Sequence, residues 1–288
     1  MRSVDGNTRH FGKVFNEIAD EYDRNRPTYP DKLIDQACQI ADLHEGDSVL
    51  EVGCGSGQLT RSLATRDLNI TALEPGEQLL ALAKRNLQGA KNVEFINARF
   101  EDATLPGRLY KAVFSASAFH WVDPKVGWQK AAGLLVPGGT LALVQYFGRQ
   151  EAWSAPDQEA LLSAMRRIVP EIATSWPVYH DVDTAIAGIQ QRRNNISEVW
   201  AWLGNYGVEQ PYASQLFNGV EVAIVPSRSE KTADELNALT RTLSYYARLT
   251  PDQRQALENE NKAISARSGR PIRVSTMAVL VTAQSKSP

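Results

Sequence analysis

The sequence predicts an α/β fold in which helices cover both faces of a mostly parallel sheet. Three observations lead to this fold class. Between residues 47 and 147, short apolar segments alternate with helical segments of about ten to fifteen residues, a pattern typical of parallel strands joined by helices. A glycine-rich turn directly follows the first strand. The chain ends in an alternating segment that suits an antiparallel strand.

The N-terminal part is expected to form two helices. Four residues recur at the spacing of one helix face, namely Phe11, Phe15, Ile18 and Tyr22. Tyr22 is therefore expected on the buried side of this helix. The proline-containing segment 26–30 ends it, and a second helix is expected over residues 31–42.

Strands and helices then alternate along the chain. The segments expected to form strands are residues 47–52, 68–74, 92–98, 110–116 and 139–147. The segments expected to form helices between them are residues 57–66, 77–87 and 124–136. The tripeptide Pro137-Gly138-Gly139 is expected to be a turn before the last of these strands.

The alternation stops near Tyr146, and this change defines the expected domains. Residues 1–150 are expected to form the N-terminal helices and the ligand-binding core. Residues 151–217 are expected to form a helical lid insertion, because they contain helical segments without a clear strand and hold four of the six tryptophans. Residues 218–288 are expected to complete the core with strands at 219–227 and 270–283, and the last strand is expected at the sheet edge.

Composition excludes several classes of partner. The net charge of −2 and the pI of about 6.1 provide no positive surface for a nucleic-acid backbone. The first thirty residues contain no apolar signal segment, and no apolar run is long enough to span a bilayer, so a cytoplasmic protein without membrane contact is expected. Two cysteines and four scattered histidines indicate no metal site. The oligomeric state is not indicated.

The glycine turn is suited to a ligand that approaches the backbone closely. Its glycines, Gly53, Gly55 and Gly57, have the spacing G-x-G-x-G, and Glu51 precedes them. A dinucleotide turn has the spacing G-x-G-x-x-G, and a Walker loop requires a lysine after its last glycine, so the turn matches neither pattern. A nucleotide-like ligand is still expected at the carboxyl ends of the strands.

Residues 49–60 resemble motif I of the class I S-adenosylmethionine-dependent methyltransferases, which has the pattern E/D-x-G-x-G-x-G. The resemblance implies a Rossmann-like sheet, S-adenosyl-L-methionine as cofactor and S-adenosyl-L-homocysteine as product. It also implies that an acid after the second strand, here Glu74 followed by Pro75, accepts hydrogen bonds from the ribose. Segments 15–30 and 114–124 are similar to the small-molecule branch called methyltransferase type 11 or trans-aconitate-methyltransferase-like.

The same resemblance implies further cofactor contacts. The loop after the third strand would enclose the adenine. Many relatives have an acid there, but this chain has Arg99, so the backbone around Arg99 and Phe100, or the Glu101 carboxylate, is expected to replace it. The other residues expected at the cofactor are Tyr22, Glu51, Gly53, Gly55, Gly57, Gln58, Ser115 and Ala116.

The catalytic residues are expected to be His120 and Tyr22. His120 follows the fourth strand and is the expected general base, because an ordinary imidazole is neutral at physiological pH. Tyr22 would orient the acceptor or help to deprotonate it. The alternatives are that His120 only forms hydrogen bonds and that Tyr22 only covers the cofactor. The residues expected at the acceptor are Tyr29, Phe119, Trp121, Trp153 and Trp200.

The sequence is therefore interpreted as a methyltransferase for a small apolar or aromatic acceptor. Carbon, nitrogen and oxygen are all compatible as the methylated atom, and an indole-containing natural product is one example. Methylation of a small carboxylic acid stays open because of Arg24, Arg26, Arg192 and Arg193. A non-catalytic adenosylmethionine-binding regulator and a nicotinamide-dependent oxidoreductase are further alternatives.

Overall fold

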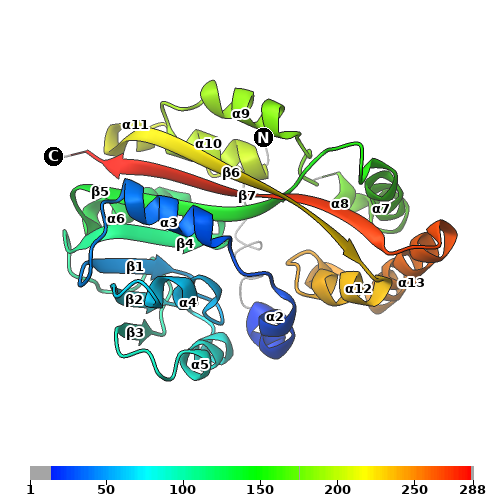
Figure 1. The fold of residues 1–288 in the computed structure, drawn as a ribbon, viewed down its shortest axis with the longest axis horizontal. Coiled ribbons are helices and arrows are strands. Elements are labelled where there is room, and N and C mark those ends of the chain that lie inside the picture. The colour runs from blue at the N-terminus through cyan, green and yellow to red at the C-terminus, as the bar shows by residue number, and fades with distance from the viewer. Residues whose placement is uncertain (1–13, 175, 287–288) are drawn as a thin grey trace.

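A seven-stranded sheet organises the computed structural model, which describes residues 14–174 and 176–286 (Figure 1). Its strands are β1 (Ser48–Val52), β2 (Asn69–Leu73), β3 (Val93–Ile96), β4 (Tyr110–Ala116), β5 (Leu135–Gly148), β6 (Phe217–Lys231) and β7 (Ile272–Ser285). They lie in the order β3-β2-β1-β4-β5-β7-β6. Pairing is parallel from β3 to β5, and β7 is antiparallel to both neighbours. The expected α/β fold with an antiparallel C-terminal strand is confirmed.

Helices connect the strands and cover the sheet. Up to β5 they are α1 (Val14–Glu17), α2 (Ala19–Asn25), α3 (Asp31–Ile40), α4 (Gln58–Ala64), α5 (Glu77–Asn86) and α6 (Pro124–Leu134). After β5 they are α7 (Ala155–Ile168), α8 (Pro170–Ala173), α9 (Val182–Gln190), α10 (Ile196–Gly204), α11 (Ala213–Leu216), α12 (Ala233–Arg241) and α13 (Pro251–Ser268). Short 3₁₀ turns span Phe119–Trp121 and Tyr246–Arg248.

The last strand does not lie at the sheet edge, and that expectation was wrong. β7 lies between β5 and β6, which occupies the edge instead. Residues 277–283 of β7 are all buried, whereas most of β6 is at least partly exposed. A continuous apolar run is typical of a strand that is covered on both faces, which explains why β7 takes the interior position.

Two local expectations also need correction. The tripeptide at residues 137–139 lies inside β5, where Gly138 has a φ of 76° and the register against β4 shifts. The strand therefore continues through an irregularity where a turn was expected. The first helix is interrupted at Ile18 between α1 and α2, and Phe11 lies outside the described residues.

The core has one apolar cluster on each face of the sheet. Successive strand residues alternate between them, as for Val49 and Leu50 in β1, because side chains of a strand point to opposite faces. The cluster that contains Val49 packs against α3 and α4. The cluster that contains Leu50 packs against α6 and α10, and it includes Trp128 and Trp200. This double cover holds the carboxyl ends of the parallel strands in fixed positions.

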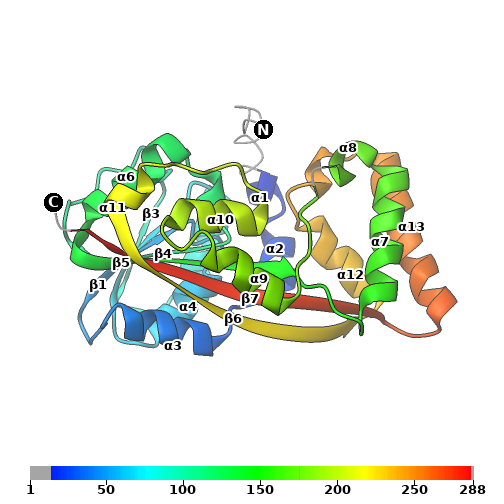
Figure 2. The same ribbon diagram turned by 90° about the horizontal axis from the view of Figure 1, so that it is seen from above.

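The helices after β5 divide into two groups. α9 to α11 belong to the sheet core, through buried residues such as Ala185, Trp200 and Ala213. α7, α8, α12 and α13 form a separate helical body at the far end of the long strands (Figure 2). This body has its own apolar cluster, which includes Met165, Ile172 and Leu257. The expected boundaries at residues 150 and 217 stay predictions.

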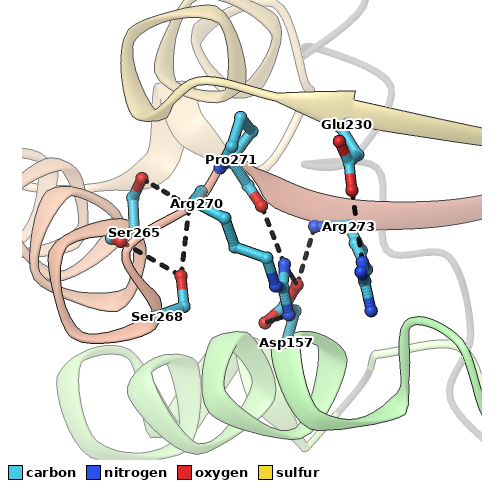
Figure 3. Close-up of polar contacts among 7 residues, drawn as sticks. All are labelled: Asp157, Glu230, Ser265, Ser268, Arg270, Pro271 and Arg273. Atoms are coloured by element: carbon cyan, nitrogen blue, oxygen red, sulfur yellow. Dashed lines mark hydrogen bonds and ion pairs between the residues drawn. The ribbon is translucent and has the colours of Figure 1, made fainter.

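A buried carboxylate joins this helical body to β7 (Figure 3). Asp157, on α7, accepts hydrogen bonds of 2.7 and 3.1 Å from the Arg270 guanidinium and one of 2.7 Å from the Arg273 backbone N–H. Burial opposes the charged form of Asp157, but these hydrogen bonds prevail and lower its pKa. Asp157 thus fixes the point where α13 leads into β7.

We predict that Asp157→Asn lowers the free energy of unfolding by about 1–3 kcal/mol, because the amide would place a donor against the Arg270 donors. Asp183→Asn, an exposed change on α9, is the matched control. Urea titrations of both variants measure the effect. Equal midpoints for the two variants would contradict the assigned role of Asp157.

Candidate active site

The glycine turn after β1 has a backbone that side chains would disrupt. Gly53, Gly55 and Gly57 have φ values of 73°, 57° and 93°, in the left-handed region that favours glycine. A Cβ at Gly53 would lie 2.4 Å from the Ala118 Cβ, and one at Gly57 would lie 2.7 Å from the Leu87 Cδ1. Space and backbone conformation both require glycine at these two positions.

Glu74 connects this turn to the end of β2. Its Oε2 accepts a hydrogen bond of 2.9 Å from the Gly55 N–H, and its Oε1 accepts one of 2.8 Å from the Gly76 N–H. Burial raises the pKa of Glu74, and the two backbone hydrogen bonds partly oppose that shift. Because a carboxylate can accept about four hydrogen bonds, each oxygen keeps capacity for a ligand hydroxyl.

Glu51 is a second buried carboxyl, beneath the turn. Its Oε2 accepts a hydrogen bond of 2.7 Å from the Thr60 hydroxyl on α4. Burial raises the pKa of Glu51 to about 7, and the negative charge of Glu74 adds to that shift. Glu51 therefore holds the first strand against α4.

A cavity of about 1310 Å³ lies at the carboxyl ends of the parallel strands. Its walls come from the sheet, the N-terminal helices and the helical body. The residues expected from the sequence that line it are Tyr22, Gly53, Gly55, Glu74, Pro75, Arg99, Phe100, Glu101, Ala116, His120 and Trp121. Residues far apart in the sequence thus meet in one cavity.

Several expected residues lie elsewhere. Phe119 and Trp200 are buried in the sheet core, and the Trp153 ring packs against the guanidinium groups of Arg228 and Arg273. Ser115 donates its hydroxyl to the Val52 carbonyl at 2.8 Å. Gly57 lines neither this cavity nor a second one that adjoins it. Three other expected residues, Tyr29, Glu51 and Gln58, line the second cavity but not the first.

The N-terminal helix covers the glycine turn. A Cβ at Gly55 would lie 3.9 Å from the Tyr22 hydroxyl oxygen, and burial raises the pKa of that hydroxyl. The Arg26 guanidinium lies 5.0 Å from the Tyr22 ring centre and donates a hydrogen bond of 2.6 Å to the Thr242 carbonyl. Among the described residues no carboxylate pairs with Arg26, and its Nε is buried without a partner. Arg26 therefore offers an uncompensated positive charge in the cavity wall.

His120 is enclosed by aromatic rings. Its ring stacks on Tyr206, with 4.3 Å between ring centres and 6° between planes, and its Nδ1 is buried without a hydrogen-bond partner in the part of the chain that the structure describes. Burial lowers the pKa of His120 to about 3, and Arg26 adds to that shift. The imidazole is thus neutral across the physiological pH range. A general base works best when its pKa is near the working pH. With its lowered pKa, His120 is therefore a weaker base than expected.

The loop after β3 is held by its own contacts. Arg99 pairs with the Glu101 carboxylate at 3.0 Å, and the same carboxylate oxygen accepts the Asp123 N–H at 2.9 Å. Phe100 is buried beneath the Lys130 ammonium. Both of these contacts use Oε1 of Glu101 and hold its side chain against the loop.

Several residues that line the cavity were not predicted from the sequence. Gln145 interrupts the apolar run 141–147 of β5, and this interruption was a usable signal. Its Oε1 is buried, and no described residue forms a hydrogen bond with it. Tyr206, Trp176, Tyr179 and Tyr245 also line the cavity. All four lie in segments between the helices, where no helix or strand period indicates the direction of a side chain.

The described ranges, 14–174 and 176–286, contain no group of three or more His, Cys, Asp or Glu residues that could hold a metal ion. Within the same ranges no helix is both long and apolar enough to cross a membrane.

Comparisons with known proteins agree with this geometry. Residues 50–143 match a family model described as a methyltransferase domain. The chain is 34% identical over 136 residues to an uncharacterized methyltransferase of Mycobacterium tuberculosis, covering 47% of this chain and 53% of that protein. The chain thus spans about half the length of this curated relative. The resemblance to class I methyltransferases is confirmed.

Solved structures show the same fold. A structure assigned as a type II methyltransferase from Anaeromyxobacter dehalogenans has a TM-score of 0.56 and 21% identity, over 90% of this chain and 97% of that one. A SAM-dependent methyltransferase from Thiobacillus denitrificans, in complex with S-adenosyl-L-homocysteine, has a TM-score of 0.50 and 15% identity, over 91% of this chain and 94% of that one. The Rossmann-like sheet is thus confirmed.

We predict that Glu51→Gln changes how stability depends on pH. The pKa of Glu in an unfolded chain is about 4.3, whereas that of Glu51 in the native state is about 7. Between these two pH values Glu51 is therefore protonated in the native state and ionised in the unfolded state. The free energy of unfolding of the native sequence therefore falls as pH rises through this window, and the Gln variant lacks that fall. Urea titrations at pH 5 and pH 8 should show the variant gaining relative stability at pH 8. An equal difference at both pH values would contradict the raised pKa.

Proposed function

We propose that the protein transfers a methyl group from S-adenosylmethionine to a small acceptor. The observation that supports this most directly is the Glu74 carboxylate, fixed by two backbone N–H groups beside three glycines in left-handed conformation. A carboxylate in this position suits the two neighbouring hydroxyls of a ribose. The related proteins described as methyltransferases support the same reaction class.

The cavity offers a place for each part of the nucleoside. Glu74 would accept hydrogen bonds from the ribose hydroxyls, and the backbone around Arg99 and Phe100 would border the adenine. Arg26 lies near the glycine turn and pairs with no carboxylate of the described residues, so we assign it to the carboxylate of the methionine end. Tyr22, whose raised pKa keeps its hydroxyl protonated, would cover this end and donate a hydrogen bond.

The chemistry places modest demands on the protein. The bound sulfonium supplies an activated methyl group, and the wall residues have to align an acceptor atom with it. Such alignment can contribute roughly 7 kcal/mol or more to rate acceleration. The rings of Trp121 and Tyr206 contact the His120 ring, and Phe147 also lines the cavity. These flat apolar walls favour an apolar or aromatic acceptor, which a neutral His120 would orient through a hydrogen bond.

The arginines give little support to an acidic acceptor. Arg24 is exposed and bonds to the Asp20 carbonyl on its own helix. Arg192 lies over the Trp202 ring and bonds to the Gly188 carbonyl. Arg24, Arg192 and Arg193 are absent from the cavity wall, and Arg26 is used for the methionine end in our assignment.

We predict that Glu74→Gln weakens S-adenosylmethionine binding by about 10- to 100-fold, because it replaces charge-assisted hydrogen bonds to the ribose with weaker ones. Glu94→Gln, an exposed change on β3 outside the cavity, is the matched control. Isothermal titration with S-adenosylmethionine, S-adenosylhomocysteine and NAD measures the effect. Binding of NAD alone would refute the proposed function.

Turnover requires an acceptor, which is found by incubating the protein with labelled S-adenosylmethionine and a panel of indoles, phenols and small acids. Mass spectrometry then identifies the methylated product. With that acceptor, we predict that His120→Gln lowers kcat/KM by about 10-fold and leaves the shape of the pH profile unchanged. A loss of 10²- to 10⁴-fold, with the acid limb of the profile removed, would instead show that His120 is the general base.

A further inference from the structure

A second cavity of about 630 Å³ adjoins the first. The two share the wall formed by residues 145–148 at the carboxyl end of β5, together with Trp176, Tyr179 and Tyr245. The first cavity alone exceeds the range of about 300–1,000 Å³ that is usual for one ligand. The two cavities therefore offer more room than a nucleoside and a compact acceptor require.

Leucines from the helical body line the second cavity. Five of them are Leu161 and Leu162 on α7, Leu236 and Leu239 on α12, and Leu243 just beyond α12, and a sixth, Leu257 on α13, is buried in the body's own apolar cluster. The first five are only partly buried, and none of them belongs to an apolar cluster formed by the described residues. We call the part of the second cavity that these five leucines line the leucine chamber. Apolar side chains gathered around a cavity favour an apolar occupant, because its burial removes their surface from water.

Several polar groups on the strand side of the chamber are paired, whereas Gln145 Oε1 and Ser154 Oγ are buried without a partner among the described residues. Arg228 forms an ion pair with Glu151 at 2.7 Å, and Arg273 forms one with Glu230 at 3.2 Å. The hydroxyls of Ser227 and Thr276 are 2.7 Å apart and share a hydrogen bond. Such pairs place little demand on an occupant for hydrogen bonds or charge. The leucines on the helices therefore determine which kind of ligand this cavity favours.

We propose that the acceptor is amphiphilic, with its reactive head beside His120 and a hydrocarbon tail in the leucine chamber. Leu243 lines both cavities. This inference rests on the proposed function, since it concerns the acceptor of the same site. It specifies the class of acceptor as a ring or small polar head that carries an alkyl or prenyl chain.

Binding of 4-alkylphenols tests the chamber. Phenol, 4-butylphenol and 4-octylphenol are titrated into the whole protein with saturating S-adenosylhomocysteine, and the dissociation constants are measured by calorimetry. Each buried methylene can tighten binding by about fourfold, so we expect 4-octylphenol to bind at least about 30-fold more tightly than phenol. The double variant Leu162→Gln and Leu239→Gln should reduce this gain to less than about threefold. Leu239→Trp, which fills the chamber without adding charge, should shorten the longest tail that binds.

Leu109→Gln is the control for a surface leucine, because Leu109 is exposed and lies outside both cavities. It should keep the full gain with chain length. Thermal stabilisation by S-adenosylhomocysteine is measured for every variant, so that folding and the nucleoside site are checked separately. If the nucleoside stabilises the protein but chain length has the same effect in the native and double-variant proteins, the leucine chamber is refuted. If chain length matters in the native protein only, while the nucleoside never binds, the proposed function fails and the chamber stands.

Discussion

The hydrogen bonds that join Glu74 to Gly55 and Gly76 are the constraint on which the candidate site depends. They tie the ends of β1 and β2 together and hold a buried carboxylate in a fixed orientation. The backbone reinforces this arrangement, because the N–H groups of Gly53 and Cys54 both donate to the Leu73 carbonyl at 2.9 Å. A carboxylate held this way needs little reorganisation to receive a ligand.

The other residues that line the cavity around Glu74 and the glycine turn come from distant parts of the chain. Helix α2 supplies Tyr22 and Arg26, the segment after β4 supplies His120, and the segment after α10 supplies Tyr206. Their environment changes their chemistry, because enclosure keeps the His120 ring neutral and the Tyr22 hydroxyl protonated. The site is therefore better suited to align and enclose a ligand than to move protons at neutral pH.

Local features of the chain were predictable, and features set by distant contacts were not. The turn at Gly53 to Gly57 and the acid at Glu74 follow from residue types that fit a strand-turn-helix unit. The interior position of β7 depends on its pairing with β6, and the burial of Trp200 depends on packing against the sheet. An aromatic ring in a helical segment can serve a core or a cavity equally well, so sequence alone could not separate Trp200 from Tyr206.

Helix α2 contacts both α5 of the core and α12 of the helical body, and Arg26 bonds to the carbonyl of Thr242. Glu21 and Arg241 add an ion pair of 3.6 Å across the same junction. Tyr22 and Arg26 line both cavities, so displacement of this one short helix would uncover the two together. In the proposed methyl transfer, exchange of spent nucleoside and release of product would then share a single opening, and the rate of that opening would set an upper limit on turnover.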